Sequence, residues 1–207
     1  MSKASNLRYR VVGLTLAAAL GAGLGLGLSG CGRQGGAPSA SAPVAQIGGP
    51  FQLVDQNGRP IDQTVLKGKW TAVFFGYTYC PDVCPTTLQT LGSASDLLGA
   101  KARALQVVFV TVDPARDTPA QLKDYLSSGS FPRGIIGLTG TPEQIGKAAG
   151  EYKVYFQKNG SGANYSVDHS SAIYLMNPKG DFDSVIQFGL TPEQTRDQIA
   201  NAMNKAG

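Results

Sequence analysis

The sequence is poor in the residues that most often bind metals or attack substrates. Its 207 residues include a single histidine, His169, and three cysteines, Cys31, Cys80 and Cys84. It also lacks a basic stripe: three of its 18 Lys and Arg residues precede an apolar N-terminal run, which leaves 15 basic residues against 14 acidic ones. A near-neutral chain has little affinity for a phosphate backbone. We therefore expect no nucleic-acid partner and only a small set of candidate ligands.

Residues 1–31 have the pattern of a targeting segment rather than of a folded element. Residues 1–10 carry a net positive charge from Lys3, Arg8 and Arg10 and precede an apolar stretch over 11–28. Leu28-Ser-Gly-Cys31 ends that stretch. This ending resembles the lipobox of bacterial lipoproteins, in which the cysteine carries the lipid and becomes the mature N-terminus. The alternative is an uncleaved membrane helix, for which 11–28 is near the minimum of roughly 17 to 25 residues. Either anchor places the rest of the chain on the periplasmic or extracytoplasmic side of a bacterial membrane.

The rest of the chain is expected to be a linker followed by one α/β domain. Residues 32–46 are rich in Gly, Ala, Ser and Pro, as in flexible linkers, and the domain is expected over 47–207. It opens with a hairpin that turns at Asn57-Gly58. Further strands are expected over 70–75, 105–112, 134–138, 153–157, 164–167, 172–176 and 185–188. Helices are expected over 86–98, 118–126, 141–152 and 191–203, and each of the last three begins with a Thr-Pro-x-Gln capping box.

Cys80 and Cys84 lie where a buried strand turns into a helix. Pro81 favours an extended Cys80, and Cys84 is expected in or just before the first helical turn. A helix N-terminus favours thiolate over thiol, and the thiolate both binds metal and attacks disulfides. A dithiol at the end of a strand narrows the fold to a thioredoxin-like three-layer sandwich, with a mixed central sheet and the N-terminal hairpin as an extension.

His169 could supply a third ligand, although a lone histidine is more often structural. We expect it in a loop, where Asp168 or a backbone carbonyl would orient its ring. Asp113 follows a core strand and could orient a ligand residue or contact a partner. The alternative is that it only forms the turn that ends the strand. Two thiolates and one imidazole form a soft ligand set that suits copper(I). Tyr77 and Tyr79, which flank the dithiol, are expected to pack.

Three sequence blocks, taken in order, resemble the Sco (SenC) family of membrane-anchored copper chaperones. They are residues 74–87 around the Cys80-Pro-Asp-Val-Cys84 loop, Val112-Asp-Pro-Ala-Arg-Asp-Thr-Pro119, and Asp168-His-Ser followed by residues 173–180. The resemblance implies a thioredoxin-like fold that binds copper through Cys80, Cys84 and His169. It also implies a partner, cytochrome c oxidase subunit II, whose CuA site receives copper or has its cysteines reduced.

The leading interpretation is therefore a copper chaperone without catalytic turnover, in which Cys80 and Cys84 form a redox-active dithiol. The main alternative is a thiol–disulfide oxidoreductase acting on extracytoplasmic partner cysteines, which needs the dithiol but not His169. A third interpretation is a peroxidase of the peroxiredoxin type, which would use Cys80 as the peroxidatic residue and Cys84 as the resolving one. A structural zinc site normally has four ligands, so it would require Asp113 or Asp168 to join the other three.

Overall fold

The computed structural model describes residues 46–205. The predicted targeting segment 1–31, with Cys31, lies outside the described residues, as does the predicted linker except for its last residue. Within the described part of the chain, no helix is both long enough and apolar enough to cross a membrane.

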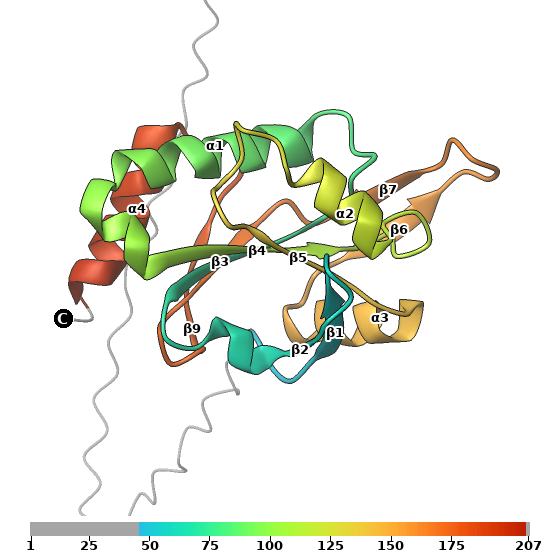
Figure 1. Ribbon diagram of the computed structural model, residues 1–207, viewed down its shortest axis with the longest axis horizontal. Helices are drawn as coiled ribbons and strands as arrows, with labels where there is room; N and C mark the ends of the chain where they lie inside the picture. Colours follow the sequence, from blue (N-terminus) through green and yellow to red (C-terminus); the bar gives the residue numbers. More distant parts are fainter. Residues whose placement is uncertain (1–45, 206–207) are drawn as a thin grey trace, which may run out of the picture. The chain divides into compact units, whose positions relative to one another are not determined.

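A seven-stranded mixed sheet forms the centre of the domain (Figure 1). Its strand order is β2-β1-β5-β4-β3-β8-β9, with β3, β4 and β5 parallel and the remaining pairs antiparallel. Strands β6 and β7 pair only with each other. The strands are β1 (Gln52–Asp55), β2 (Pro60–Asp62), β3 (Trp70–Gly76), β4 (Leu105–Thr111), β5 (Ile136–Thr139), β6 (Phe156–Asn159), β7 (Ser166–His169), β8 (Ile173–Met176) and β9 (Phe182–Ile186).

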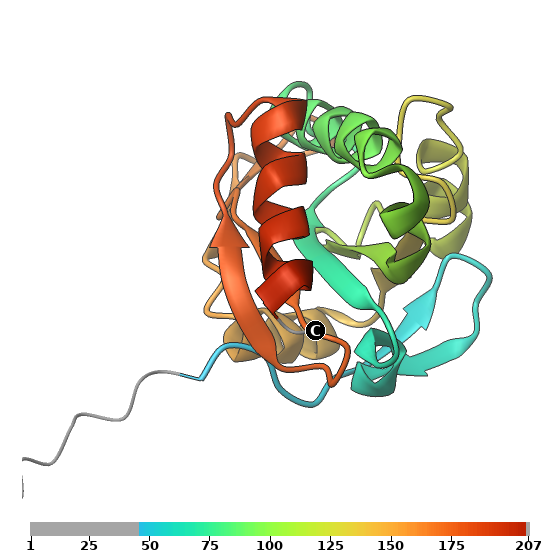
Figure 2. The ribbon, with the colours of Figure 1, turned by 90° about the vertical axis from the view of Figure 1, so that its left-hand side faces the viewer.

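Helices cover both faces of this sheet, which makes the domain a three-layer sandwich. Figure 1 shows α1, α2 and α4 over one face and α3 over the other, and Figure 2 shows α4 beside α1. The helices are α1 (Val83–Leu97), α2 (Pro119–Tyr125), α3 (Pro142–Glu151) and α4 (Pro192–Lys205). Two 3-10 helices, Gln63–Leu66 and Gly99–Ala104, were not expected. The predicted thioredoxin-like fold class is confirmed.

The core follows from the central strands, in which every β3 residue is buried. Alternation along β3 sends Phe74 towards α1 and Phe75 towards α3. The Phe74 ring packs against Phe109 of β4, with centroids 6.0 Å apart. On the opposite face, the Phe75 ring lies 5.2 Å from Tyr152, directly after α3. Two covered faces explain why β3 and β4 are almost continuously apolar.

The hairpin predicted at the N-terminus of the domain is present as β1 and β2. The Asp55 carboxylate accepts hydrogen bonds from the Asn57 and Arg59 amides at 2.8 and 2.9 Å. Gly58 has a φ of 77°, which glycine adopts without the steric cost that other residues meet. The hairpin joins the main sheet through pairing of β1 with β5.

The predicted helix caps are largely present. Thr141 and Thr191 form reciprocal capping boxes with Gln144 and Gln194. Thr118 accepts the backbone amide of Gln121 at 3.2 Å, which is the threonine half of the box. Each cap satisfies amides that the first helical turn cannot pair.

Some predicted boundaries were wrong. Strand β9 ends at Ile186, so the prediction of 185–188 lay too late in the chain. Helix α1 begins at Val83 rather than Thr86, because Pro85 falls in the first turn, where its missing amide costs no intrahelical hydrogen bond. Both errors arose at boundaries that the local sequence pattern specifies weakly.

Candidate metal centre

Cys80, Cys84 and His169 lie together at one end of the central sheet. Their possible ligand atoms all lie within 4.8 Å of one another. Cys84 Sγ and His169 Nε2 are 3.5 Å apart, although 85 residues separate them in the sequence. Among residues 46–205, this is the one group of three or more His, Cys, Asp or Glu side chains with such spacing.

The two cysteines occupy different local structures. Cys80 follows the end of β3 in an irregular turn and is partly exposed, whereas Cys84 is the second residue of α1 and is buried. Asp82 occupies the N-cap position, but its side chain accepts the Thr86 hydroxyl at 3.3 Å and caps no amide. The sequence predicted Cys84 in or just before the first helical turn, and the structure places it within that turn.

His169 is the last residue of β7, and the prediction that it lies in a loop was wrong. Its Nδ1 lies 2.9 Å from the Ser170 carbonyl oxygen, so a proton on Nδ1 leaves the Nε2 lone pair facing Cys84. Tyr77 and Phe74 contact the ring edge-on, with centroids 5.8 and 6.2 Å away. Asp168, which alternates with His169 along β7, is exposed, so the ring is oriented by a backbone carbonyl rather than by that carboxylate.

The two thiols share one negative charge unequally. A hydrogen bond from the Cys84 thiol holds the pKa of Cys80 well below its ordinary range, and the nearby His169 imidazole adds to this effect, whereas burial opposes it. The same contact with Cys80, together with burial, raises the pKa of Cys84. The helix N-terminus was expected to favour thiolate at both positions, whereas the pair places the charge on the more exposed sulfur. Cys80 can therefore attack or bind first, and Cys84 must lose a proton before it can bind a metal.

Asp117 anchors the chain just before the cysteines, a role that sequence reasoning missed. Its buried carboxylate accepts hydrogen bonds from the Thr78 amide, the Thr78 hydroxyl and the Thr111 hydroxyl at 3.0, 2.7 and 2.6 Å. Thr78 is two residues before Cys80, and Thr111 is the last residue of β4. The carboxylate thus joins the ends of the two central strands. No local pattern indicated this, because Thr78 lies 39 residues away.

Burial raises the pKa of the Asp117 carboxyl, although hydrogen bonds from Thr111 and Thr78 oppose that rise. The folded pKa therefore exceeds the unfolded value of about 3.9. The protonated group contributes stability that is complete below the unfolded pKa and is lost as the pH rises through the folded pKa. Asp117→Asn keeps one acceptor oxygen for the Thr78 amide and the Thr111 hydroxyl, its Nδ2 can donate to the Thr78 hydroxyl oxygen, and it carries no charge. We expect this variant to gain stability relative to wild type between pH 4 and pH 7. Urea denaturation at both pH values measures this gain.

The matched control is Asp117→Ala, which leaves the Thr78 amide without its acceptor. It should lose about 1 to 3 kcal/mol at both pH values. If the difference in free energy of unfolding between Asp117→Asn and wild type does not grow from pH 4 to pH 7, the raised pKa of Asp117 is contradicted.

Asp113 and Asp168, the candidates for supporting the site, lie outside the three-ligand group. Asp113 is buried and forms an ion pair with Arg116, and it accepts the Tyr165 hydroxyl at 2.6 Å. Neither carboxylate supplies the fourth ligand that a structural zinc site would need. Tyr77 packs in the core as expected, whereas Tyr79 is 55% exposed and the prediction that it packs was wrong.

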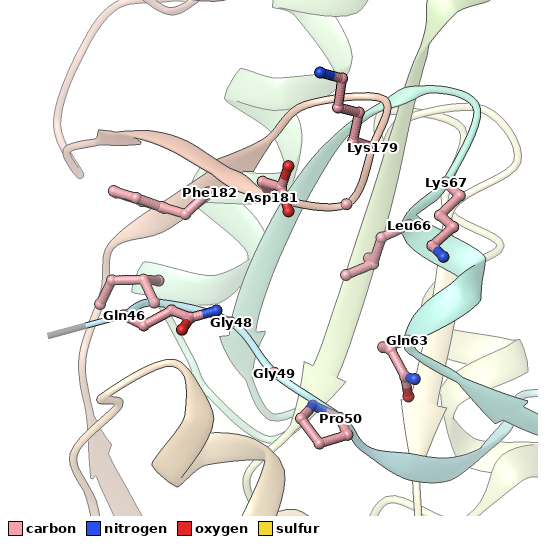
Figure 3. A pocket seen from close by; sticks show the side chains of 12 residues that line it. Gln46, Gly48, Gly49, Pro50, Gln63, Leu66, Lys67, Lys179, Asp181 and Phe182 are labelled. Atoms are coloured by element: carbon pink, nitrogen blue, oxygen red, sulfur yellow. The ribbon is translucent and has the colours of Figure 1, made fainter.

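A hollow of about 760 Å³ lies away from the cysteines, at the opposite end of β3. Figure 3 shows Leu66 and Lys67, which precede β3, facing Lys179 and Asp181 in the turn between β8 and β9. None of the three predicted ligands lines it. Within the candidate centre, Cys80 is partly exposed whereas Cys84 is buried, and an accessible sulfur suits exchange of a ligand with another macromolecule.

The ligand set fits a soft metal ion. Donor atoms bound to one ion at about 2.0 to 2.3 Å lie roughly 4 Å apart, close to the spacing of the three groups. Two sulfurs and one imidazole nitrogen favour copper(I) over harder ions. Partial exposure of Cys80 leaves one side of the group open to an incoming ligand.

Comparisons with known proteins agree with this arrangement. The SCO1/SenC family model matches residues 39–204. The mitochondrial protein SCO1 homolog 1 of Arabidopsis thaliana is 43% identical over 144 residues, which are 69% of this chain and 42% of that protein. The chain therefore spans less than half of that relative's length.

Two solved structures extend the comparison. The structure of Bradyrhizobium japonicum ScoI with copper bound matches with a TM-score of 0.69 and 44% identity, over 75% of this chain and 99% of that chain. BsSco matches with a TM-score of 0.62 and 26% identity, over 78% of this chain and 94% of that chain. BsSco is described as a member of the Sco family of cytochrome c oxidase assembly proteins in which a disulfide switch was identified.

Proposed function

This chain belongs to the SCO1/SenC family, and we propose that it is a membrane-tethered copper chaperone. Cys80, Cys84 and His169 bind copper and deliver it to the CuA site of cytochrome c oxidase subunit II, or reduce the cysteines of that site. The observation that carries the proposal is the convergence of three soft donors within 4.8 Å from segments far apart in the sequence. The related ScoI with copper bound supports the choice of metal.

Copper is the cargo of this protein, and its transfer needs no catalytic turnover. A site with three ligands accepts a fourth, so an incoming partner thiolate can bind copper before any ligand leaves. The partly exposed Cys80 is on the accessible side of the group, whereas Cys84 is buried. Stepwise exchange of thiolates then moves the ion to the partner without releasing it to solvent.

Tethering to the membrane is proposed from residues 1–31 alone. The lipobox-like Leu28-Ser-Gly-Cys31 supports a lipid on Cys31, and the apolar run over 11–28 is the basis of the alternative helix. Either anchor would confine the domain near an integral membrane acceptor on the extracytoplasmic side. The linker over 32–46 gives the domain reach from that anchor.

A thiol–disulfide reductase is the second candidate, favoured by the unequal charge on the two sulfurs. The Cys80 thiolate would attack a partner disulfide to form a mixed disulfide and release one partner thiolate. Cys84 would lose its proton and attack the Cys80 sulfur, which frees the second partner thiolate and leaves a Cys80–Cys84 disulfide. An external thiol reductant must then restore the dithiol. This route makes no use of His169 as a metal ligand.

Copper(I) titration separates the two candidates. The reduced full-length chain in detergent is titrated under anaerobic conditions against bathocuproine disulfonate, beside His169→Ala. A chaperone should bind one equivalent tightly, and loss of the imidazole should weaken binding while both thiols remain reactive. Weak or substoichiometric binding that is unaffected by His169→Ala, together with dithiol turnover indifferent to copper, would instead favour the reductase.

A further inference from the structure

The β6–β7 hairpin that carries His169 is not part of the main sheet. Its two strands pair only with each other, and Figure 1 shows the hairpin extending beyond the body of the domain. An isolated two-stranded hairpin is marginally stable in water. The position of His169 relative to the cysteines therefore depends on the contacts that fix this hairpin to the domain.

Arg116 makes the most extensive polar connection between the loop end of this hairpin and the rest of the domain. It lies in the loop between β4 and α2, on neither the cysteine segment nor the hairpin, and its side chain is only 15% exposed. Its Nη1 donates a hydrogen bond to the Tyr165 carbonyl at 3.0 Å. Tyr165 directly precedes β7, at whose other end His169 lies.

The same guanidinium is fixed from three other directions. Nε donates to the Asp113 carboxylate, whose other oxygen accepts the Tyr165 hydroxyl at 2.6 Å. The guanidinium carbon lies 3.6 Å from the centroid of the Tyr165 ring. It lies 4.6 Å from the ring of Tyr79, the residue before Cys80, and 5.7 Å from the ring of Tyr77. One side chain thus contacts both the segment that leads into the cysteines and the segment that leads into the histidine.

We propose that Arg116 is a positioning residue that holds the β6–β7 hairpin, and with it His169, against the cysteine pair. The proposal rests on the proposed function, since it assumes that His169 is a ligand. A planar guanidinium can form this fork of hydrogen bonds and stack on tyrosine rings at the same time, which a lysine ammonium cannot do. Without Arg116, the two sulfurs keep their places in the turn after β3 and in α1, and the imidazole loses its fixed distance from them.

Other contacts of the hairpin do not replace Arg116. The Tyr77 hydroxyl accepts the Val167 amide at a long 3.3 Å, and Ser170 exchanges hydrogen bonds with Tyr155 within the hairpin segment itself. These contacts allow the hairpin to stay folded in the absence of Arg116. The expected defect is therefore one of distance between ligands and not of global folding.

A double-mutant cycle on copper(I) affinity tests the role. The reduced full-length chain is titrated against bathocuproine disulfonate as wild type, Arg116→Gln, His169→Ala and the double variant. Outer groups that orient metal ligands typically change affinity roughly 10- to 100-fold, and we expect Arg116→Gln to weaken copper binding within that range. Because Arg116 acts through His169, the double variant should bind no more weakly than His169→Ala alone.

X-ray absorption of the copper-loaded Arg116→Gln chain gives a readout that a purely structural role would not change. The spectrum should lose the contribution of the imidazole nitrogen to the copper coordination and retain that of the two sulfurs. Tyr165→Phe, which removes only the hydroxyl bond to Asp113, is the milder variant if Arg116→Gln folds poorly, and its smaller loss should likewise vanish in the His169→Ala background. Arg59→Gln is the matched control, since Arg59 also pairs with an aspartate, Asp55, in the distant hairpin.

The outcomes are separable. Losses that add in the double variant, or wild-type affinity in both Arg116→Gln and Tyr165→Phe, would overturn the positioning role and leave the proposed copper function intact. If His169→Ala itself binds copper as tightly as wild type, then the third-ligand assignment fails and the positioning role fails with it.

Discussion

Replacing Cys84 by serine is expected to abolish stoichiometric copper(I) binding, and Cys80→Ser should do the same. Copper(I) prefers soft thiolates, and a serine hydroxyl stays protonated at neutral pH and offers a hard donor instead. Removing groups that merely orient a metal ligand costs roughly 10- to 100-fold in affinity, so removing one of two thiolates should cost more than about 100-fold. Competition with bathocuproine disulfonate under anaerobic conditions measures the loss.

Asp168→Asn is the matched control for the cysteine variants. Asp168 adjoins His169 in β7 but is exposed and lies outside the three-ligand group. The copper(I) affinity of the Asp168→Asn variant should therefore stay within a few-fold of wild type. Circular dichroism of the serine variants shows whether the fold persists. Tight binding by either serine variant in the folded state would contradict the assignment of that cysteine as a ligand.

Gly76→Ala should produce the second large effect, by displacing Cys84. A Cβ atom on Gly76 would lie 2.7 Å from Cys84 Sγ and 2.9 Å from Phe109 Cε2, and contacts under 3.0 Å force neighbouring atoms to move. Cys84 and Phe109 are both fully buried, so neither has free space beside it, and the sulfur, which is the nearer of the two, must shift together with the ring. Overpacking of this kind lowers the free energy of unfolding by about 1 to 3 kcal/mol. Each kcal/mol lowers the melting temperature by about 2 to 4 °C in a domain of this size.

Copper affinity should fall together with stability in this variant, because a displaced sulfur no longer meets the narrow distance range of a metal ligand. We expect at least about a tenfold loss, equivalent to about 1.4 kcal/mol. Gly146→Ala is the control: that glycine is exposed in α3, and a Cβ there meets nothing within 4 Å. Alanine in a helix is favoured over glycine by roughly 0.5 to 1 kcal/mol, so the control should be slightly stabilised. Wild-type copper affinity in Gly76→Ala would show that Cys84 needs no such clearance.

Much of the fold could be predicted from short-range patterns. The apolar run over 70–75 became a fully buried strand, the threonine caps start α2, α3 and α4, and the Asn57-Gly58 pair turns a hairpin. Each of these features depends on residues within a few positions of one another. Boundaries were less certain where weak signals competed, as at the start of α1 and in β9.

By itself, the sequence determined which residues can carry the chemistry. It contains one histidine and two cysteines outside the N-terminal segment, and the spacing of Cys80 and Cys84 across Pro81 placed both at a strand-to-helix junction. Together with two further blocks it also identified the family, which the comparisons confirm. These conclusions need only residue types and local spacing.

Only the tertiary structure decided how those residues relate to one another. The parallel pairing of β3 with β4 brings Thr78 to Asp117, and the hairpin brings His169 to Cys84 and Tyr165 to Arg116. It also brought the two thiols into contact and buried one of them, which lowers the pKa of Cys80 and raises that of Cys84. The physical reason is that hydrogen bonds, stacking and burial act between atoms a few ångströms apart, whereas the contributing residues are separated by tens of positions along the chain.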